Sequence, residues 1–280
     1  MLRSAETMKS ESHVTKEVAK WTTWWVGQRR SKLEKKLNET MSVNPFLLPF
    51  LFSYHDLDNF SGLADLIIAS HLMTGHNTGF GKLIDEKILP NVFDATKLDR
   101  AYRNSNPPFH QSCFDEIDHH IIRSDGESNL LSLKAGPWTI QLTMAVQLNS
   151  AFKEIFDNHP NSVNKIVVGV FYGKNSELTD KYDILRGINR GANHNVFNLT
   201  DRVEVYAGRE FWSWLNDGEP ATQEWVLKGI LTALEREAIH ETATELLNSF
   251  KQSVVDKYDA EVRNSDGTID WYKLLSKING

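Results

Sequence analysis

An alternating pattern on both sides of a short glycine-containing turn constrains the fold of this chain more than any other feature. The two arms cover residues 114–123 and 127–136, and the turn between them is Ser124-Asp125-Gly126. A three-residue loop with glycine in third place is typical of a β-hairpin closed by a left-handed glycine. The sequence therefore predicts two antiparallel strands in which the numbers of paired residues add up to 250.

The two faces of this hairpin differ in polarity. The register places Asp118 opposite Ser132, and it places Glu116 opposite Lys134. Successive side chains of a strand point to opposite faces, so we expect one polar face and one buried face. The polar face carries Glu116, Asp118, His120, Ser128, Ser132 and Lys134, and the buried face carries Ile117, Ile121, Leu131 and Leu133. An acid and a lysine facing each other here, Asp118 and Lys134, can hold a metal ion and a water against a phosphate.

Helical patterns dominate both ends of the chain. We expect helices over residues 13–41, 63–73, 209–216, 222–257 and 271–277, with a short one ending near Leu89, and strands over 164–172 and 202–206. Residues 74–81 are expected to form a loop. A further helix is expected to start at Gly136-Pro137, because proline is tolerated in a first turn, and to bury a stripe that includes Trp138 and Phe152.

This order of elements predicts the fold class. Helices, then mixed strands and helices, then helices again indicate an α/β (α+β) fold, with a mixed sheet flanked by helices and additional N- and C-terminal helices. We expect three consecutive regions: a helical region over 1–74, a central domain over 75–216 and a second helical region over 217–280.

Composition limits the class of protein. The 280 residues are 40% hydrophobic and 24% charged, as in soluble globular proteins. The net charge of −6 means that a nucleic-acid partner would need a local basic cleft.

The single cysteine, Cys113, excludes an intramolecular disulfide. Residues 1–20 lack an apolar signal core, and the apolar run 46–52 is too short to span a bilayer. We therefore expect a cytoplasmic protein without a membrane partner.

A strand, a hairpin that bears an acid and a lysine, and then a helix resemble the local plan of the PD-(D/E)XK nucleases. The whole chain resembles a type II restriction endonuclease of this superfamily, among the enzymes that cut RGGNCCY. The similarity covers most of the chain, and these segments carry it: Trp24-Trp25, Thr74-Gly75-His76, Phe114-Asp115-Glu116-Ile117-Asp118-His119, Leu131-Ser132-Leu133-Lys134-Ala135-Gly136, Asn193-His194-Asn195 and Phe211-Trp212-Ser213-Trp214-Leu215.

The resemblance implies a PD-(D/E)XK core and assigns roles to residues of the hairpin. Asp118 matches the first acid, a Mg²⁺ ligand, and Lys134 matches the lysine that orients or activates the attacking water. Leu133 matches the middle residue, whose backbone carbonyl often completes the metal shell. Ser132 stands where a second acid is expected, which is a departure from the pattern. Glu116 and Glu86 are the candidates to replace that acid, with Glu154 a more distant third.

Two segments are candidates for DNA contact. Guanine is read by Arg or Lys and adenine by Asn or Gln, and one glycine-punctuated loop offers such groups: Arg186, Asn189, Arg190, Asn193, His194 and Asn195. The basic end of the first helix, with Arg29, Arg30 and Lys32, would contact the phosphate backbone. An ordinary polar loop and a solvated helix face are the alternatives. A palindromic site calls for a two-fold homodimer, for which the terminal helices are the natural surface.

The resemblance thus implies a Mg²⁺-dependent endonuclease that cuts double-stranded DNA. A DNA-binding module with a decayed nuclease site is one alternative, and a structure-specific repair nuclease of the same fold is another. A third is an interaction protein that does not bind nucleic acid, in which Asp118 and Lys134 form an ordinary cross-strand ion pair.

Overall fold

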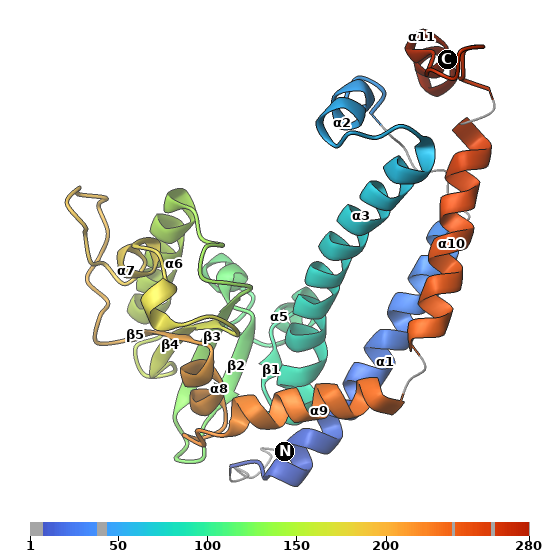
Figure 1. Cartoon of the computed structure of the whole chain (residues 1–280). Coiled ribbons are helices and arrows are strands. Elements are labelled where there is room, and N and C mark those ends of the chain that lie inside the picture. The colour runs from blue at the N-terminus through green and yellow to red at the C-terminus, as the bar shows by residue number, and fades with distance from the viewer. Residues whose placement is uncertain (1–7, 38–43, 237–238, 259–260, 280) are drawn as a thin grey trace. The chain divides into compact units, whose positions relative to one another are not determined.

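The computed structural model describes residues 8–37, 44–236, 239–258 and 261–279 (Figure 1). The chain divides into two compact units, Met1–Thr22 with Gly81–Ala233 and Thr23–Phe80 with Leu234–Gly280. This division differs from the three consecutive regions expected over 1–74, 75–216 and 217–280, because segments from both ends of the chain contribute to the second unit.

A five-stranded mixed sheet forms the centre of the first unit and makes this an α/β protein. Its strands lie in the order of the sequence: β1 (Thr96–Lys97), β2 (His119–Ile122), β3 (Ser128–Lys134), β4 (Lys165–Val170) and β5 (Val203–Ala207). The pairs β1–β2 and β2–β3 are antiparallel, whereas β3–β4 and β4–β5 are parallel. Parallel strands need a long crossover connection, which usually contains a helix, and α6 (Leu142–Asn158) and α7 (Lys181–Ile184) lie in those connections.

The hairpin between β2 and β3 has the predicted register. His119 pairs with Leu131 and Ile122 pairs with Ser128, so the paired numbers add up to 250. Gly126 has a φ of +87° and its backbone N–H donates to the Arg123 carbonyl at 2.9 Å. Only glycine adopts this conformation without strain, which explains why the turn has glycine in third place.

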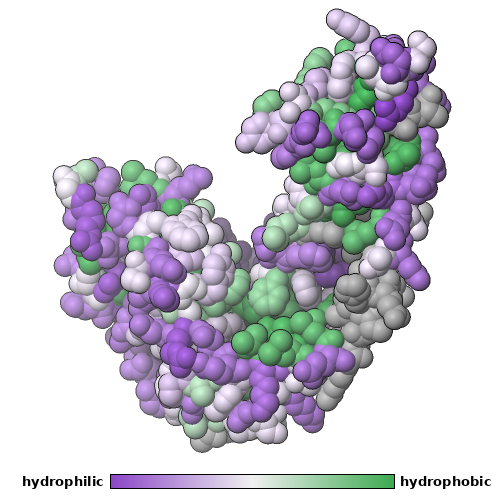
Figure 2. Space-filling model, in the orientation of Figure 1, coloured by the Kyte–Doolittle hydropathy of each residue, from purple (hydrophilic) through white to green (hydrophobic). Residues whose placement is uncertain are grey.

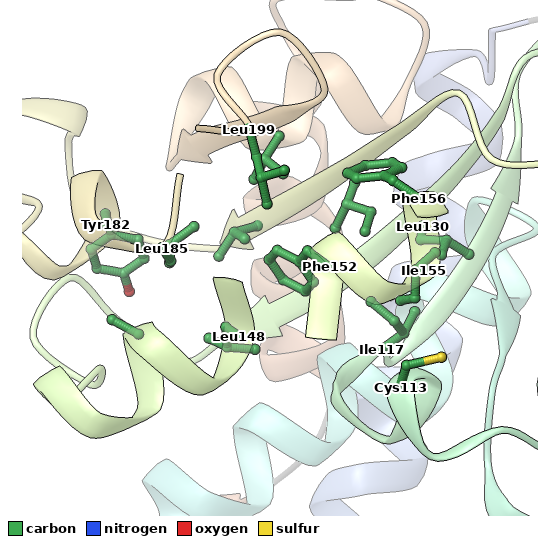
Figure 3. Close-up of a cluster of buried hydrophobic side chains, with 14 of the residues drawn as sticks. Cys113, Ile117, Leu130, Leu148, Phe152, Ile155, Phe156, Tyr182, Leu185 and Leu199 are labelled. Carbon is green, nitrogen blue, oxygen red and sulfur yellow. The ribbon is translucent and has the colours of Figure 1, made fainter. Parts of the chain in front are cut away.

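Both faces of the hairpin are covered, so the expectation of one open polar face is wrong. Ser132 and Leu130, on the face expected to be polar, are fully buried. Figure 3 shows Leu130 in the cluster that α6 covers with Phe152 and Ile155. On the opposite face Leu131 lies close to Gly169 of β4, against which Phe211 of α8 (Arg209–Leu215) also packs. A strand in the parallel part of a sheet is normally covered on both faces.

The helix after β3 begins later than predicted. It starts at Leu142 instead of Pro137, and Trp138 is 72% exposed instead of buried. The Gly136-Pro137 segment is held by a hydrogen bond, in which Tyr182 Oη donates to the Gly136 carbonyl at 2.9 Å. This turn separates the end of β3 from the start of α6.

The glycine-rich segment 74–81 is helical, so the expected loop is not present. Helix α3 (Phe60–Leu83) runs through it and is followed by a π-helix, η1 (Ile84–Ile88), and by α4 (Leu89–Val92). Gly75 and Gly79 lie against Arg29 of α1 (Glu11–Leu37), and Gly79 also lies against Trp25. These glycines therefore serve close packing of two helices and not a turn.

The remaining described elements are a short helix of the second unit, short helices of the first unit, and three helices toward the C-terminus. They are α2 (Leu48–Tyr54), α5 (Arg100–Ser105), the 3₁₀ helices η2 (Ser112–Glu116) and η3 (Asn175–Glu177), α9 (Thr222–Arg236), α10 (Ile239–Tyr258) and α11 (Trp271–Asn279). The helix expected over 222–257 is helical wherever it is described, as α9 and α10, and residues 237–238 between them lie outside the described residues. The second unit has its own core, where Phe52, Phe60 and Phe250 are buried together. Among the described residues, no helix is long and apolar enough to cross a membrane.

Gly169 provides a test of how tightly the sheet is packed next to the hairpin. A Cβ at this position would lie 2.4 Å from Phe211 Cε2 and 2.8 Å from Leu131 Cδ1. We expect Gly169→Ala to lower the free energy of unfolding by about 1–3 kcal/mol through overpacking. Gly81→Ala is the matched control, because nothing lies within 4 Å of its Cβ position; it should stabilise α3 by up to about 1 kcal/mol. Urea denaturation measures both, and an equal response would contradict the packing argument.

Candidate active site

Asp118 lies at the entrance of β2 and is fixed to β3 by two hydrogen bonds. Its backbone N–H donates to the Leu131 carbonyl at 2.9 Å, and its carboxylate Oδ2 accepts the backbone N–H of Leu133 at 2.7 Å. The carboxylate is about one-third exposed, with 35% of its side-chain surface accessible. The pairing of β2 with β3 therefore directs the Asp118 carboxylate toward the end of β3 and leaves it accessible to solvent.

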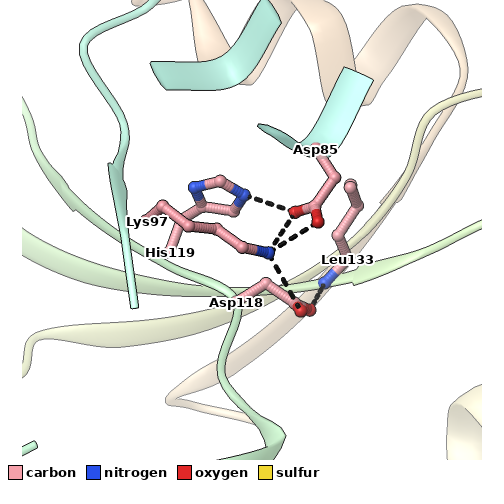
Figure 4. A network of polar contacts seen from close by, with 5 residues as sticks. All are labelled: Asp85, Lys97, Asp118, His119 and Leu133. Carbon is pink, nitrogen blue, oxygen red and sulfur yellow. Dashed lines mark hydrogen bonds and ion pairs between the residues drawn. The ribbon is translucent and has the colours of Figure 1, made fainter. Parts of the chain in front are cut away.

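A lysine from the edge strand lies next to this acid. Lys97 belongs to β1 and pairs with His119 of β2. Figure 4 shows its ammonium group between two carboxylates: Lys97 Nζ is 2.6 Å from each oxygen of Asp85 and 3.8 Å from Asp118 Oδ1. Three short elements thus bring two acids and one ammonium to one place.

Asp85 is the second acid, and a buried histidine orients it. It lies on η1, and its Oδ1 is 2.8 Å from Nε2 of His119, a residue with no exposed surface. A carboxylate only accepts hydrogen bonds, so Nε2 of His119 carries the proton. Burial by itself would raise the pKa of Asp85, but the hydrogen bonds from His119 and Lys97 and the charge of Lys97 hold that pKa below its ordinary value. Asp85 is therefore kept ionised.

The expected contact between Asp118 and Lys134 is replaced by a contact between Asp118 and Lys97. Lys134 is the last residue of β3 and is half-buried. Among the residues that the structure describes, its side chain forms no hydrogen bond or ion pair. It follows Leu133, whose N–H contacts Asp118, so it remains beside the site with its ammonium uncommitted.

The acids suggested as replacements for Ser132 do not lie where they were expected. Glu116 ends the 3₁₀ helix η2 and is exposed, so it is not opposite Lys134 on a strand. Glu86 is on η1 but exposed, and it is its neighbour Asp85 that contacts the site. Glu154 is exposed on α6. Ser132 itself is fully buried, and its hydroxyl has no hydrogen-bond partner within the described part of the chain.

Sequence reasoning missed Asp85 and Lys97 for identifiable reasons. A π-helix has an extra residue in its turn, so a 3.6-residue period does not tell which of the adjacent acids Asp85 and Glu86 faces the sheet. Lys97 lies in a strand of only two residues, Thr96–Lys97, which is too short to show alternation. The adjacent acid pair on the helix before the hairpin was the one available signal.

The oxygen atoms gathered here suit a hard divalent cation. Asp85 and Asp118 supply carboxylates that lie on either side of one ammonium group, and the backbone N–H of Leu133 binds the carboxylate of Asp118. Within the described residues, no group of three or more His, Cys, Asp or Glu side chains is placed to hold a metal. Mg²⁺ is compatible with this sparse set, because it prefers oxygen, keeps several waters and often uses one or two protein carboxylates.

The loop expected to read bases lies between α7 and β5, and its base is anchored. Asn149 of α6 is fully buried; its Nδ2 donates to the carbonyls of Leu185 and Phe197, and its Oδ1 accepts the Phe197 N–H. Arg186 is tied to this base too, since its Nε donates to the Val203 carbonyl at 3.1 Å. Nε of Arg186 thus helps to hold the base of the loop, and the predicted base contact of this residue stays a prediction.

The tip of the same loop is exposed and polar. Asn189, Arg190, Asn193 and Asn195 are exposed, and His194 is half-buried. Figure 2 shows that hydrophilic side chains predominate over this part of the drawn face. Several of these groups make local contacts: Arg190 bonds to Asp183, while Asn189 and Asn193 accept backbone N–H groups of the loop. These contacts shape the tip and leave further donors open to solvent.

The basic residues of α1 have different environments. The guanidinium of Arg29 packs against Gly75 and Gly79 of α3, which does not suit contact with a phosphate backbone. Burial lowers the pKa of the His76 imidazole, and the positive charge of Arg29 lowers that pKa further. Lys32 is exposed, and the side chain of Arg30 lies outside the described residues.

Comparison of the chain with known protein families gives no match.

Proposed function

We propose that the chain is a Mg²⁺-dependent endonuclease of the PD-(D/E)XK type, which hydrolyses phosphodiester bonds of double-stranded DNA. In its finer form the proposal is a type II restriction endonuclease, a homodimer acting at a palindromic site such as RGGNCCY. The observation that supports it most is that the carboxylates of Asp85 and Asp118 both lie next to the ammonium group of Lys97, beside the end of β3. The sequence resemblance had left the second acid unidentified, and Asp85 is a carboxylate in a suitable place.

The local plan around these acids also supports the proposal. Strand β1, the β2–β3 hairpin and helix α6 come in this order along the chain, with α5 and η2 between β1 and β2, and Asp118 directly precedes β2 while Lys134 ends β3. This is the strand, hairpin and helix arrangement that the resemblance implies. Lys134 follows the residue whose N–H binds Asp118, and its ammonium group, which has no partner among the described residues, would contact the substrate.

The residues have distinct parts in the proposed hydrolysis. Asp85, Asp118 and the Leu133 carbonyl would hold Mg²⁺, which when bound supplies a Lewis acid for the scissile phosphate. Lys134 would orient the attacking water and offset the phosphate charge. His119 keeps Asp85 in position through its bond to Oδ1. Water adds to phosphorus in line with the oxygen that leaves, and the P–O bond to that oxygen breaks.

Asp85 and Asp118 together carry two negative charges, and Lys97 compensates for one of them. Lys134 beside the site supplies a second positive charge, so the two acids and the two lysines balance, and the negative charge of a bound phosphate would be left uncompensated unless a divalent cation were also bound. This electrostatic balance gives a physical reason for metal dependence. It also separates the proposal from the alternative of a purely structural ion-pair cluster, which needs no added cation.

DNA contact is assigned to the loop after α7. Its exposed tip, with Arg190 and Asn193 among its donors, carries the groups that read base edges, while Asn149 and Arg186 hold its base. A homodimer would place two such loops on the two halves of a palindrome.

Digestion of a sequenced plasmid tests the proposal directly. With Mg²⁺ we expect discrete double-strand fragments, and the sequence of their ends identifies the site. Cutting confined to flaps, nicks or mismatches would favour a structure-specific nuclease. A gel shift without cutting would favour a DNA-binding module with a decayed site. Absence of both cutting and salt-sensitive DNA binding would overturn the proposal.

A further inference from the structure

The ammonium group of Lys97 occupies the space between the two acids. It lies 2.6 Å from both oxygens of Asp85, which is a symmetric, bidentate contact, and 3.8 Å from Asp118 Oδ1 (Figure 4). A magnesium ion binds oxygen at about 2.0–2.1 Å. An ion shared by Asp85 and Asp118 would therefore need the same oxygens and much of the same volume as this ammonium.

We propose that Lys97 is an internal counter-cation that competes with the divalent metal for Asp85 and Asp118. This inference rests on the proposed function, because it concerns the metal site assigned there. In the metal-free protein the ammonium bridges the acids and reduces their mutual repulsion. When a divalent cation binds, the ammonium leaves Asp85, and the long, flexible stem of lysine allows it to move.

The surroundings of Lys97 support a movable role over a purely structural one. Its side chain is 27% exposed and Asp118 is 35% exposed, so solvent reaches the cluster and the ammonium is not enclosed. Asp85 keeps a second partner, since Nε2 of His119 bonds to Oδ1 from the buried side. The orientation of Asp85 therefore does not depend on Lys97 alone.

Competition of this kind predicts an unusual direction of effect: removing a charged residue from the site should strengthen metal binding. Two like charges within a few ångströms repel each other even when partly solvated. We expect Lys97→Met to bind Mn²⁺ roughly tenfold more tightly than the wild type, because the competing cation and its repulsion are both lost. Methionine keeps an unbranched apolar stem of similar length.

The experiment is titration of the full-length protein with Mn²⁺ alone, without DNA, at constant pH, with free Mn²⁺ measured by electron paramagnetic resonance. Asp85→Asn should weaken binding, because a ligand charge is removed. Lys16→Met is the matched control: it removes an equal charge from an exposed lysine of α1 that makes no ion pair within the described residues, and we expect its dissociation constant to change less than about threefold. Lys97→Gln repeats the test with a polar side chain, and circular dichroism verifies the fold of each variant.

The possible outcomes separate this inference from the proposed function. Tighter Mn²⁺ binding in Lys97→Met and Lys97→Gln, but not in Lys16→Met, supports the competition. Unchanged or weaker binding in folded Lys97 variants of a wild type that binds Mn²⁺ would overturn the competition and leave the nuclease proposal standing. An equal gain in Lys16→Met would show a general charge effect and would also overturn it. If neither the wild type nor the variants bind Mn²⁺, the metal site and the proposed function fall together.

Discussion

Asp118→Asn is expected to reduce Mg²⁺-dependent DNA cleavage by about 10²–10³-fold, the loss typical for one charge-stabilising group in a hydrolytic site. The substitution keeps the size of the side chain, and the remaining oxygen can still accept the N–H of Leu133, which now binds Oδ2 at 2.7 Å. It removes one of the two negative charges that converge on Lys97. The measurement is the initial rate of plasmid cleavage, with DNA affinity followed separately by gel shift.

Asp125→Asn is the matched control for this experiment. It makes the same chemical change in the same hairpin, at an exposed turn residue whose carboxylate accepts only the local N–H of Glu127 among the described contacts. We expect its cleavage rate to stay near that of the wild type. Cleavage by Asp118→Asn within a few-fold of the wild type would remove Asp118 from the site. Loss of DNA binding together with cleavage would indicate a folding defect instead.

The hairpin was predictable because its signals are local. Alternation of side chains and the position of Gly126 fix the turn and the register, and both are as predicted. The buried strand over Lys165–Val170 and the helix Arg209–Leu215 were predictable for a similar reason, since continuous apolar or periodic patterns mark them. These elements determine the α/β class.

The errors arise where tertiary packing overrides a local signal. Glycines at 75 and 79 were interpreted as loop residues, yet they allow Arg29 and Trp25 to pack closely on α3. Trp138 fits a helical stripe, but the chain turns at Gly136-Pro137 and exposes it. A sequence pattern shows which residues are small or apolar, but it does not show which other residues pack against them.

The candidate site was half predictable for the same reason. Asp118 comes from the hairpin, where the register was secure. Its partners Asp85 and Lys97 come from a π-helical turn and a two-residue strand, and neither element has a period that a sequence can reveal. A site assembled from the ends of short elements depends on their packing, so the contact of Lys97 with both acids required the structure.

Asn149→Ala is expected to cause the largest loss of stability among the substitutions considered, on the order of 3 kcal/mol. Asn149 has no exposed surface and makes three hydrogen bonds to the backbone of Leu185 and Phe197, at 3.1, 2.9 and 2.8 Å. Alanine leaves two carbonyls and one N–H without this partner, and each buried polar group left unpaired costs about 1–3 kcal/mol. Urea denaturation measures the loss.

The same substitution also tests whether the loop after α7, which Asn149 holds in place, contacts DNA. Because Asn149 joins α6 to both ends of the loop after α7, we expect its removal to make residues 186–198 more sensitive to protease and to weaken DNA binding beyond the loss of stability. Asn198→Ala is the control: it is exposed, and its described side-chain bonds go only to Thr200 in its own turn. Its cost should stay below about 1 kcal/mol. If Asn149→Ala destabilises the protein but leaves DNA affinity and protease sensitivity of this loop unchanged, the loop is not the DNA-reading element, and base contacts must be sought elsewhere on the chain.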